Sequence, residues 1–124
     1  QSELNKKADA TRVTKLETLT GDMSRTQVHG QPSVVFNGVT VHIRNGKGKT
    51  DSTNGRGNLV LGYDSGAKLT KTGSHNVVVG KEASYHSHSG IVGVNRNAIL
   101  QPYSVVLTGT HNTATKSFAS ITTG

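Results

Sequence analysis

The sequence has no cysteine and no tryptophan, and only 4% of its 124 residues are aromatic. The absence of cysteine excludes a disulfide framework and a thiolate-ligated metal site. No run of about eighteen apolar residues is present, and the first residues lack the pattern of a signal peptide. We therefore expect no membrane insertion of this segment. Because only 31% of the residues are hydrophobic, one copy of the chain can build only a small core.

Such a composition is also found in disordered chains, but here β-branched words recur at a regular interval. SVVLTG (104–109) is followed fifteen residues later by ASITTG (119–124), and SGIV (89–92) and SHNV (74–77) continue the pattern backwards. A unit of about fifteen residues with one short strand is too short for helical repeats. It suits one coil of a parallel β-solenoid, in which each coil buries a face against the next.

Two adjacent columns of this repeat are apolar, although neighbouring residues of a strand point to opposite faces. At fifteen-residue spacing, the first column runs from Asn76 through Ile91, and the second starts at Val77. One face can fill the coil interior and the other can pack against a second chain, so we expect a homotrimer. The predicted core and trimer residues of the head are Val77, Ile91, Val92, Val106, Leu107 and Ile121.

Residues 1–25 differ from the rest, since they contain no proline and no glycine before Gly21. Leu16, Leu19 and Met23 have the spacing of a coiled-coil seam. We expect the end of a coiled-coil stalk that continues upstream in a longer protein. The alternative is a polar, linker-like helix, because one helix with so few apolar positions is marginal in water.

Residues 26–57 are predicted to form a β-hairpin and a neck loop. Asn37-Gly38, a strong two-residue hairpin signal, separates the apolar stretches 34–36 and 39–43. The stretch 45–57 that follows is rich in glycine, lysine, serine and threonine. It includes GKGKT (46–50), but no phosphate-binding loop is expected, because the motif's first glycine is missing and a turn follows instead of a helix. The repeats then occupy residues 58–124.

The words GNLVLG (57–62), GSHNVVVG (73–80), SVVLTGTHNTA and ASITTG resemble the head repeats of YadA-like trimeric surface adhesins. This resemblance implies a left-handed parallel β-roll made by three chains. Pro102 and a three-residue insert around 66–71 depart from the pattern. The stretch KADATRVTKLETLTGD also resembles the coiled-coil linkers of phage tail fibres. The fold expected is mainly β: a trimeric parallel β-roll or β-solenoid head with short strands, preceded by an N-terminal coiled-coil helix.

Carboxylates are scarce beyond residue 25, where only Asp51, Asp64 and Glu82 occur. Their separations of thirteen and eighteen residues do not match the fifteen-residue repeat, so no acid–base pair is expected within one chain. We therefore predict that the protein is not an enzyme. A trimeric polysaccharide-degrading enzyme is the third-ranked function.

His86 and His88 stand two residues apart and would point to the same side of a strand. Repeated by three-fold symmetry, the pair would present six imidazoles, enough for an octahedral transition-metal ion on the axis. Some phage fibres use that arrangement, by resemblance only. The alternative, which we favour, places both rings on a surface loop. Apart from this metal ion, no cofactor is expected.

Residues 26–124 carry nine lysine or arginine residues against three acids, a net charge of +6 per chain and +18 per trimer. Such a charge attracts polyanions. The aromatic residues do not alternate with the basic ones as in a base-stacking platform, so nucleic acid is not the expected partner. The expected partner is an anionic glycan or lipopolysaccharide. The candidate contact residues are Lys47, Lys49, Arg56, Lys68 and Lys71.

Together these patterns predict a structural and adhesive fibre segment of an extracellular, cell-surface protein, which presents a basic head for attachment. The alternative is a phage tail-fibre or tail-spike segment that attaches a virion to its host.

Overall fold

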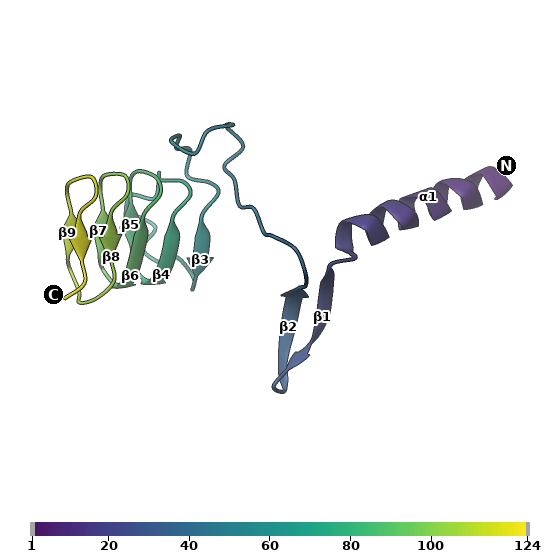
Figure 1. Cartoon of the computed structure of the whole chain (residues 1–124), viewed down its shortest axis with the longest axis horizontal. Helices are drawn as coiled ribbons and strands as arrows, with labels where there is room; N and C mark the ends of the chain where they lie inside the picture. The colour runs from purple at the N-terminus through teal and green to yellow at the C-terminus, as the bar shows by residue number, and fades with distance from the viewer. Residues whose placement is uncertain (1, 124) are drawn as a thin grey trace. The chain divides into compact units, whose positions relative to one another are not determined.

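The computed structural model describes residues 2–123 and divides into two compact units, Gln1–His42 and Ile43–Gly124. The first unit contains a helix and a β-hairpin, and the second contains a parallel β-solenoid of about four coils (Figure 1). Within residues 2–123, no helix has the length and apolar character needed to cross a membrane.

Helix α1 spans Ser2–Thr20, and all of its residues are exposed. Four threonine hydroxyls along it donate to carbonyls one turn earlier, which weakens a helix interior. The helix stops before Gly21, a poor helix former, and Met23 begins the next strand. The coiled-coil spacing therefore ends at Leu19 and does not continue through Met23 to residue 25.

A β-hairpin follows, made of strands β1 (Met23–Val28) and β2 (Gln31–Phe36). Its turn is His29-Gly30, where both residues have positive φ, as a two-residue hairpin turn of type I′ requires. The hairpin predicted around Asn37-Gly38 is wrong, because residues 37–58 contain no strand. The sequence did not indicate β1, since its MSRTQV stretch is largely polar and lacks a clear apolar alternation.

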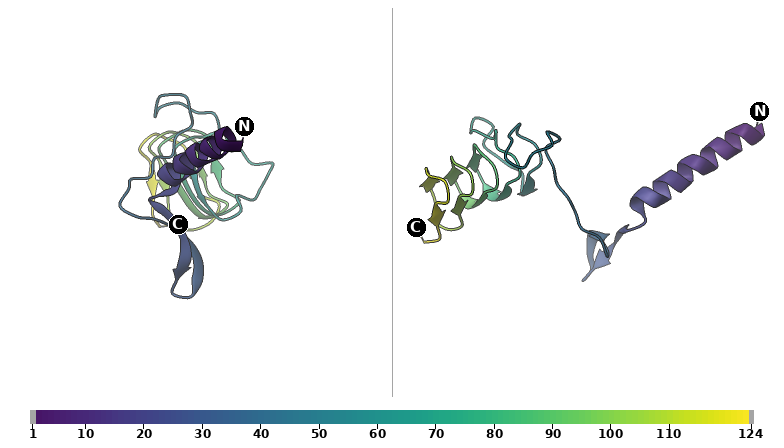
Figure 2. Two further views of the ribbon diagram at one scale, coloured as in Figure 1. Left: turned by 90° about the vertical axis from the view of Figure 1, so that its right-hand side faces the viewer. Right: turned by 45° about the horizontal axis from the view of Figure 1, so that its top comes forward.

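The second unit is a solenoid whose coils contribute strands to two parallel sheets, as Figures 1 and 2 show. The larger sheet has the order β10-β8-β6-β4-β3, and the smaller has the order β5-β7-β9. The larger sheet contains β3 (Leu59–Leu61), β4 (Val77–Lys81), β6 (Ile91–Asn95), β8 (Val105–Val106) and β10 (Ser120–Ile121). The smaller contains β5 (Ser84–Tyr85), β7 (Ala98–Ile99) and β9 (Thr113–Ala114). The predicted parallel β-solenoid is thus confirmed.

The coil length varies along the solenoid. Val77 pairs with Ile91, and Ile91 with Val105, so these steps take fourteen residues. The step from Val105 to Ser120 takes fifteen, and that from Leu59 to Val77 takes eighteen. A constant period of fifteen, extended backwards from the last coil, is therefore one residue too long for the steps from Val77 to Ile91 and from Ile91 to Val105. Because a one-residue slip exchanges the two faces of a strand, it misassigned the inner and outer columns.

The interior of the solenoid is filled by one column from each sheet. Val78, Val92 and Val106 of the larger sheet are at most 1% exposed. Tyr85, Ile99 and Ala114 of the smaller sheet are also buried and belong to the same cluster. Ile91 is 37% exposed and Leu107 is 44% exposed, so these two predicted core residues lie on the outer face instead.

Left-handed residues mark the two corners of each coil. The first corner row consists of Asp64, Glu82, Arg96 and His111, and the second of His75, Ser89, Tyr103 and Phe118, all with φ between 48° and 61°. This conformation costs a non-glycine residue roughly 1–2 kcal/mol. The turns recur at the same place in each coil, so the side chains of a row follow one another along the solenoid.

Buried asparagines compensate for these turns by satisfying backbone groups between coils. The Asn97 amide donates to the carbonyls of Gly93 and Gly109 at 2.7 and 3.1 Å, and its Oδ1 accepts from the Asn112 N–H at 2.9 Å. Asn76 does the same at the second corner, where its Oδ1 accepts from the Gly90 N–H at 2.8 Å. Asn76 is thus a corner residue and not, as the sequence indicated, part of a strand column.

Candidate ligand-binding groove, basic loops and outer sheet face

The first coil is longer because of an insert at its first corner. Residue Lys71 bridges to Tyr85 at the fourteen-residue spacing, whereas strand β3 lies eighteen residues before its partner in β4. The four additional residues therefore lie between Asp64 and Lys71. We call residues 65–70 the insert.

Asp64 anchors the insert to the solenoid. The Lys71 Nζ lies 2.7 Å from Asp64 Oδ1, and the Tyr85 hydroxyl donates to Asp64 Oδ2 at 2.6 Å. Burial alone would raise the pKa of Asp64, but the hydrogen bonds from Lys71 and Tyr85 outweigh it and lower this pKa. Burial and the neighbouring carboxylate raise the pKa of Tyr85 well above its usual value. These three side chains form a charged, hydrogen-bonded anchor.

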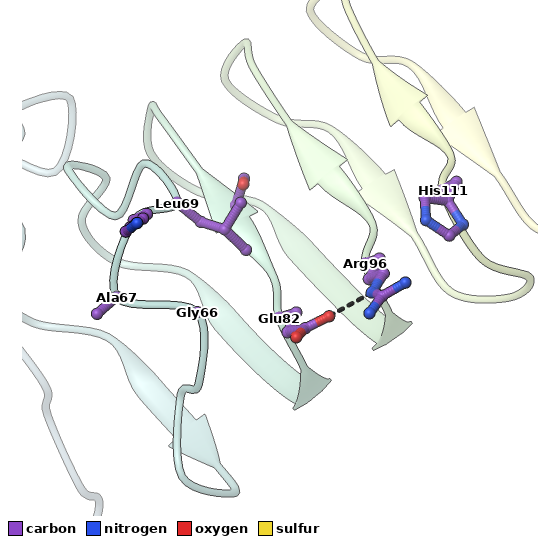
Figure 3. A pocket seen from close by; sticks show the side chains of 8 residues that line it. Gly66, Ala67, Leu69, Glu82, Arg96 and His111 are labelled. Carbon is purple, nitrogen blue, oxygen red and sulfur yellow. Dashed lines mark hydrogen bonds and ion pairs between the residues drawn. The ribbon is translucent and has the colours of Figure 1, made fainter.

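The first corner row continues beside the insert as Glu82, Arg96 and His111 (Figure 3). Arg96 Nε donates to Glu82 Oε2 across one coil step, which lowers the pKa of Glu82. His111 stands one coil further along, and its Nδ1 lies 3.1 Å from the Thr110 hydroxyl. A carboxylate, a guanidinium and an imidazole thus follow one another along this corner.

A groove of about 450 Å³ lies between the insert and this corner row. The insert supplies an apolar wall, and in Figure 3 the Leu69 side chain extends from the insert toward the coils. The corner row supplies charged groups, and β5 supplies a serine hydroxyl. The lining residues are Gly66, Ala67, Lys68, Leu69, Glu82, Ser84, Arg96 and His111. A groove of this size falls within the usual range of small-molecule sites, about 300–1,000 Å³.

The loop of residues 45–57, which we call the basic loop, carries Lys47, Lys49 and Arg56 in exposed positions. Asn45 is buried at its start, where its amide donates to the Ser52 carbonyl at 3.1 Å. His75 ties the loop to the solenoid: its Nδ1 lies 2.9 Å from the Thr50 carbonyl, and its Nε2 accepts from the Asn45 N–H at 3.1 Å. The loop is therefore held at its start and near its middle.

The outward side of the larger sheet is apolar, in contrast to that of the smaller sheet. The exposed positions of the larger sheet and its edge include Leu59, Leu61, Val79, Ile91 and Leu107, each between 37% and 53% exposed; we call them the outer apolar face. The outward positions of the smaller sheet are Ser84, Ala98 and Thr113, which are small or polar. Val77 is half-buried and lies in register with Leu59 and Ile91, so it belongs to the outward column of the larger sheet. Ile121 packs partly against the core.

The five predicted polyanion contacts are distributed over both loops. Lys47, Lys49 and Arg56 lie on the basic loop, and Lys68 lines the groove. Lys71, however, is 18% exposed and bonded to Asp64 and to the Ala83 carbonyl. Lys71 therefore holds the insert in place, and only the other four basic groups are free to face a partner.

The two candidate metal ligands differ in environment. His88 is buried, contacts the Tyr103 ring edge-on at 5.3 Å between centroids, and places its Nδ1 3.1 Å from the Ser89 hydroxyl. His86 is half-buried just after β5. Within residues 2–123 of one chain, no three histidine or acidic side chains gather as a metal-ligand set. A metal ion shared by three chains stays a prediction.

Sequence reasoning missed the groove and its residues Glu82, Ser84, Arg96 and His111. A repeat of fourteen residues would have aligned Glu82 with Arg96, and the fifteen-residue step then leads to His111. The eighteen-residue separation of Asp64 and Glu82, taken as out of register, equals the first coil step, so both carboxylates occupy the same corner row. No family profile matches this chain, and comparison with curated proteins and with solved structures likewise finds no match.

Proposed function

We propose that this chain is a segment of a homotrimeric, extracellular fibre whose solenoid head presents basic groups for attachment. The observation that carries the trimer is the exposure of the first unit: none of residues 2–42 is buried within one chain. Helices in proteins take most of their stability from tertiary packing, which α1 lacks within one chain, and a lone two-stranded hairpin is marginal in water. Packing of three copies would cover the apolar groups of these elements.

The outer apolar face supports the same assembly for the head. Monomeric proteins rarely expose a row of aliphatic side chains along a sheet, and larger apolar patches mark interaction sites. The adhesive part rests on the free cations of the basic loop and the insert. Both segments project from a rigid scaffold, where binding usually concentrates, and three-fold repetition would add weak contacts by avidity.

The alternative is a phage tail-fibre segment, which would use the same trimer to attach a virion. A polysaccharide-degrading enzyme is less well supported. Asp64 and Glu82 are both ion-paired, and the pKa of each carboxyl is lowered. A general acid for glycoside hydrolysis needs a raised pKa instead.

The assembly is tested by light scattering at micromolar concentration, where we expect three times the chain mass. A monomer mass would overturn the trimer. Adhesion is tested by binding to heparin and to lipopolysaccharide at increasing salt, because charge-mediated binding is screened by salt. The variant Lys47→Glu with Lys49→Glu should weaken binding without changing the trimer mass. Lys7→Glu with Lys15→Glu on α1 makes the same charge change outside the head and should leave binding intact. Salt-independent binding, or equal loss in both variants, would contradict the proposal.

A further inference from the structure

The groove between the insert and the first corner row differs from the basic loop in having a defined shape. We infer that it binds one carboxylate-bearing sugar unit of an acidic glycan. This inference rests on the proposed attachment function and gives it a specific ligand class. Four features of the groove support it.

The first feature is the arginine that the corner row contributes to the lining. Glu82 bonds only to the Nε of Arg96. Among the described residues, the two terminal nitrogens of Arg96 have no hydrogen-bond partner. A guanidinium has five N–H donors arranged as a fork that fits a carboxylate. Because the ion pair fixes the arginine side chain in place, little conformational entropy is lost when a second carboxylate binds.

The second feature is the balance of charge. Lys68 and Arg96 carry two positive charges, and Glu82 carries one negative charge. Lys68 has no ion-pair partner within residues 2–123. The lining therefore has a net charge of +1 with His111 neutral, which matches a singly charged carboxylate. A doubly charged phosphate would meet Glu82 without full compensation.

The third feature is the combination of an apolar wall with hydrogen-bonding groups. Leu69 is 39% exposed and, with Ala67, offers a surface for the C–H face of a sugar ring. The second oxygen of Glu82 and the Ser84 hydroxyl are free, among the described residues, to bond sugar hydroxyls. No phenylalanine, tyrosine or tryptophan ring lines the groove, so the His111 imidazole is the one ring that its lining offers to a nucleotide base.

The fourth feature is the position of the groove. It lies at the corner that joins the two sheets, because Glu82 and Arg96 directly follow β4 and β6 while Ser84 belongs to β5; the outer apolar face is the outward side of the larger sheet. A trimer that packs through the outer apolar face would therefore leave the groove accessible. The wall is also well defined: a Cβ at Gly66, where φ is +87°, would lie 2.7 Å from Leu69 Cδ1.

The test is an NMR titration of the full chain with three probes: methyl β-D-glucuronide, methyl β-D-glucoside and glucose 6-phosphate. Titration to about 20 mM covers affinities near 1 mM, the weak end of specific binding. We expect shifts at Ser84, Arg96 and His111 with the glucuronide, and at least about tenfold weaker binding of the other two. Equal binding of the glucoside, stronger binding of the phosphate, or no binding of the glucuronide would overturn the inference.

Variants separate the groove from the rest of the head. Arg96→Gln and Lys68→Gln should each reduce glucuronide affinity about tenfold, since a charged hydrogen-bond donor is lost. Arg96→Lys keeps the charge but not the fork, and it should also weaken binding. Lys116→Gln removes a charge at the opposite corner and should have no effect. If heparin binding depends on Lys47 and Lys49 while none of the groove variants alters glucuronide binding, the proposed function stands and the groove inference fails.

Discussion

The Tyr85 hydroxyl donates to Asp64 Oδ2 at 2.6 Å and thereby joins two coils of the solenoid across twenty-one residues of sequence. Tyr85 is buried in the core, whereas Asp64 stands at the corner from which the insert departs. Lys71 completes the contact by bonding to the other oxygen of Asp64 and lying 5.4 Å from the centroid of the Tyr85 ring. These contacts hold the insert, which forms one wall of the groove, to the solenoid.

We predict that the anchor is stable between about pH 4 and pH 10. The folded-state pKa of Asp64 is lowered, so its contribution to stability is present above the unfolded value near 3.9 and is lost as pH falls. The pKa of Tyr85 is raised, so its contribution is present below the unfolded value near 10 and is lost as pH rises above it. Thermal unfolding at several pH values checks both limits.

The control is Tyr85→Phe, which keeps the ring but removes the hydroxyl. The stability of this variant should no longer fall through loss of the Tyr85 proton at high pH. The variant should also unfold at a lower temperature at pH 7. An unchanged pH profile would show that the anchor contributes little to stability.

The backbone of the larger sheet gives a second prediction. At Gly80, φ is +116° and an added Cβ would lie 2.0 Å from the Val94 carbonyl oxygen. Gly80→Ala should therefore destabilise the fold by more than about 1 kcal/mol. Gly93→Ala is the matched control, because its Cβ would find no atom closer than 3.6 Å. Denaturant unfolding compares the two, and equal stability would contradict the close approach of the coils.

Two adjacent residues separate folding from assembly. Val106 is fully buried, so Val106→Asp should unfold the solenoid, since an unpaired buried carboxylate costs several kcal/mol. Leu107 is 44% exposed on the outer apolar face, so Leu107→Asp should leave the coil folded but reduce association. Circular dichroism reports the fold, and light scattering reports the mass. If the Leu107 variant still forms a folded trimer, the outer apolar face is not part of the interface.

The tether of the basic loop gives the last prediction. His75→Phe removes the partner of the Asn45 N–H and of the Thr50 carbonyl. We expect faster amide exchange and faster proteolysis within residues 45–53. His86→Phe replaces another half-buried histidine that makes no such tether and serves as the control. Equal exchange rates in both variants would show that the loop is held by its other contacts.

The sequence predicted the solenoid because parallel strands repeat their apolar residues at the same place in every coil. It did not predict which face each residue occupies. Ser104 and Ala119 occupy equivalent corner positions fifteen residues apart, but the two preceding coil steps are one residue shorter. That difference moves Ile91 from the interior to the surface. Local periodicity contains no information on such a change in coil length.

The sequence did not predict the groove for a related reason. Glu82, Arg96 and His111 differ in charge and chemistry, so nothing in their identities marks them as one row. What they share is a left-handed backbone, which a sequence indicates clearly only when glycine or asparagine occupies the position. Their asparagine neighbours, Asn97 and Asn112, were the available signal, because asparagine at corresponding places in successive coils is typical of a turn ladder.

The corner row also has a consequence for how such a head can change. Its backbone geometry recurs from coil to coil, yet it accepts an acid, a guanidinium and an imidazole in succession. At Arg96 and His111 the next residue, Asn97 or Asn112, hydrogen-bonds the backbone of the turn whichever residue stands in the row. Unlike a change at the Asp64 anchor, a substitution at Glu82, Arg96 or His111 can therefore alter the groups on this surface at little cost to folding. The solenoid backbone thus stays constant while the side chains along its corner can change one residue at a time.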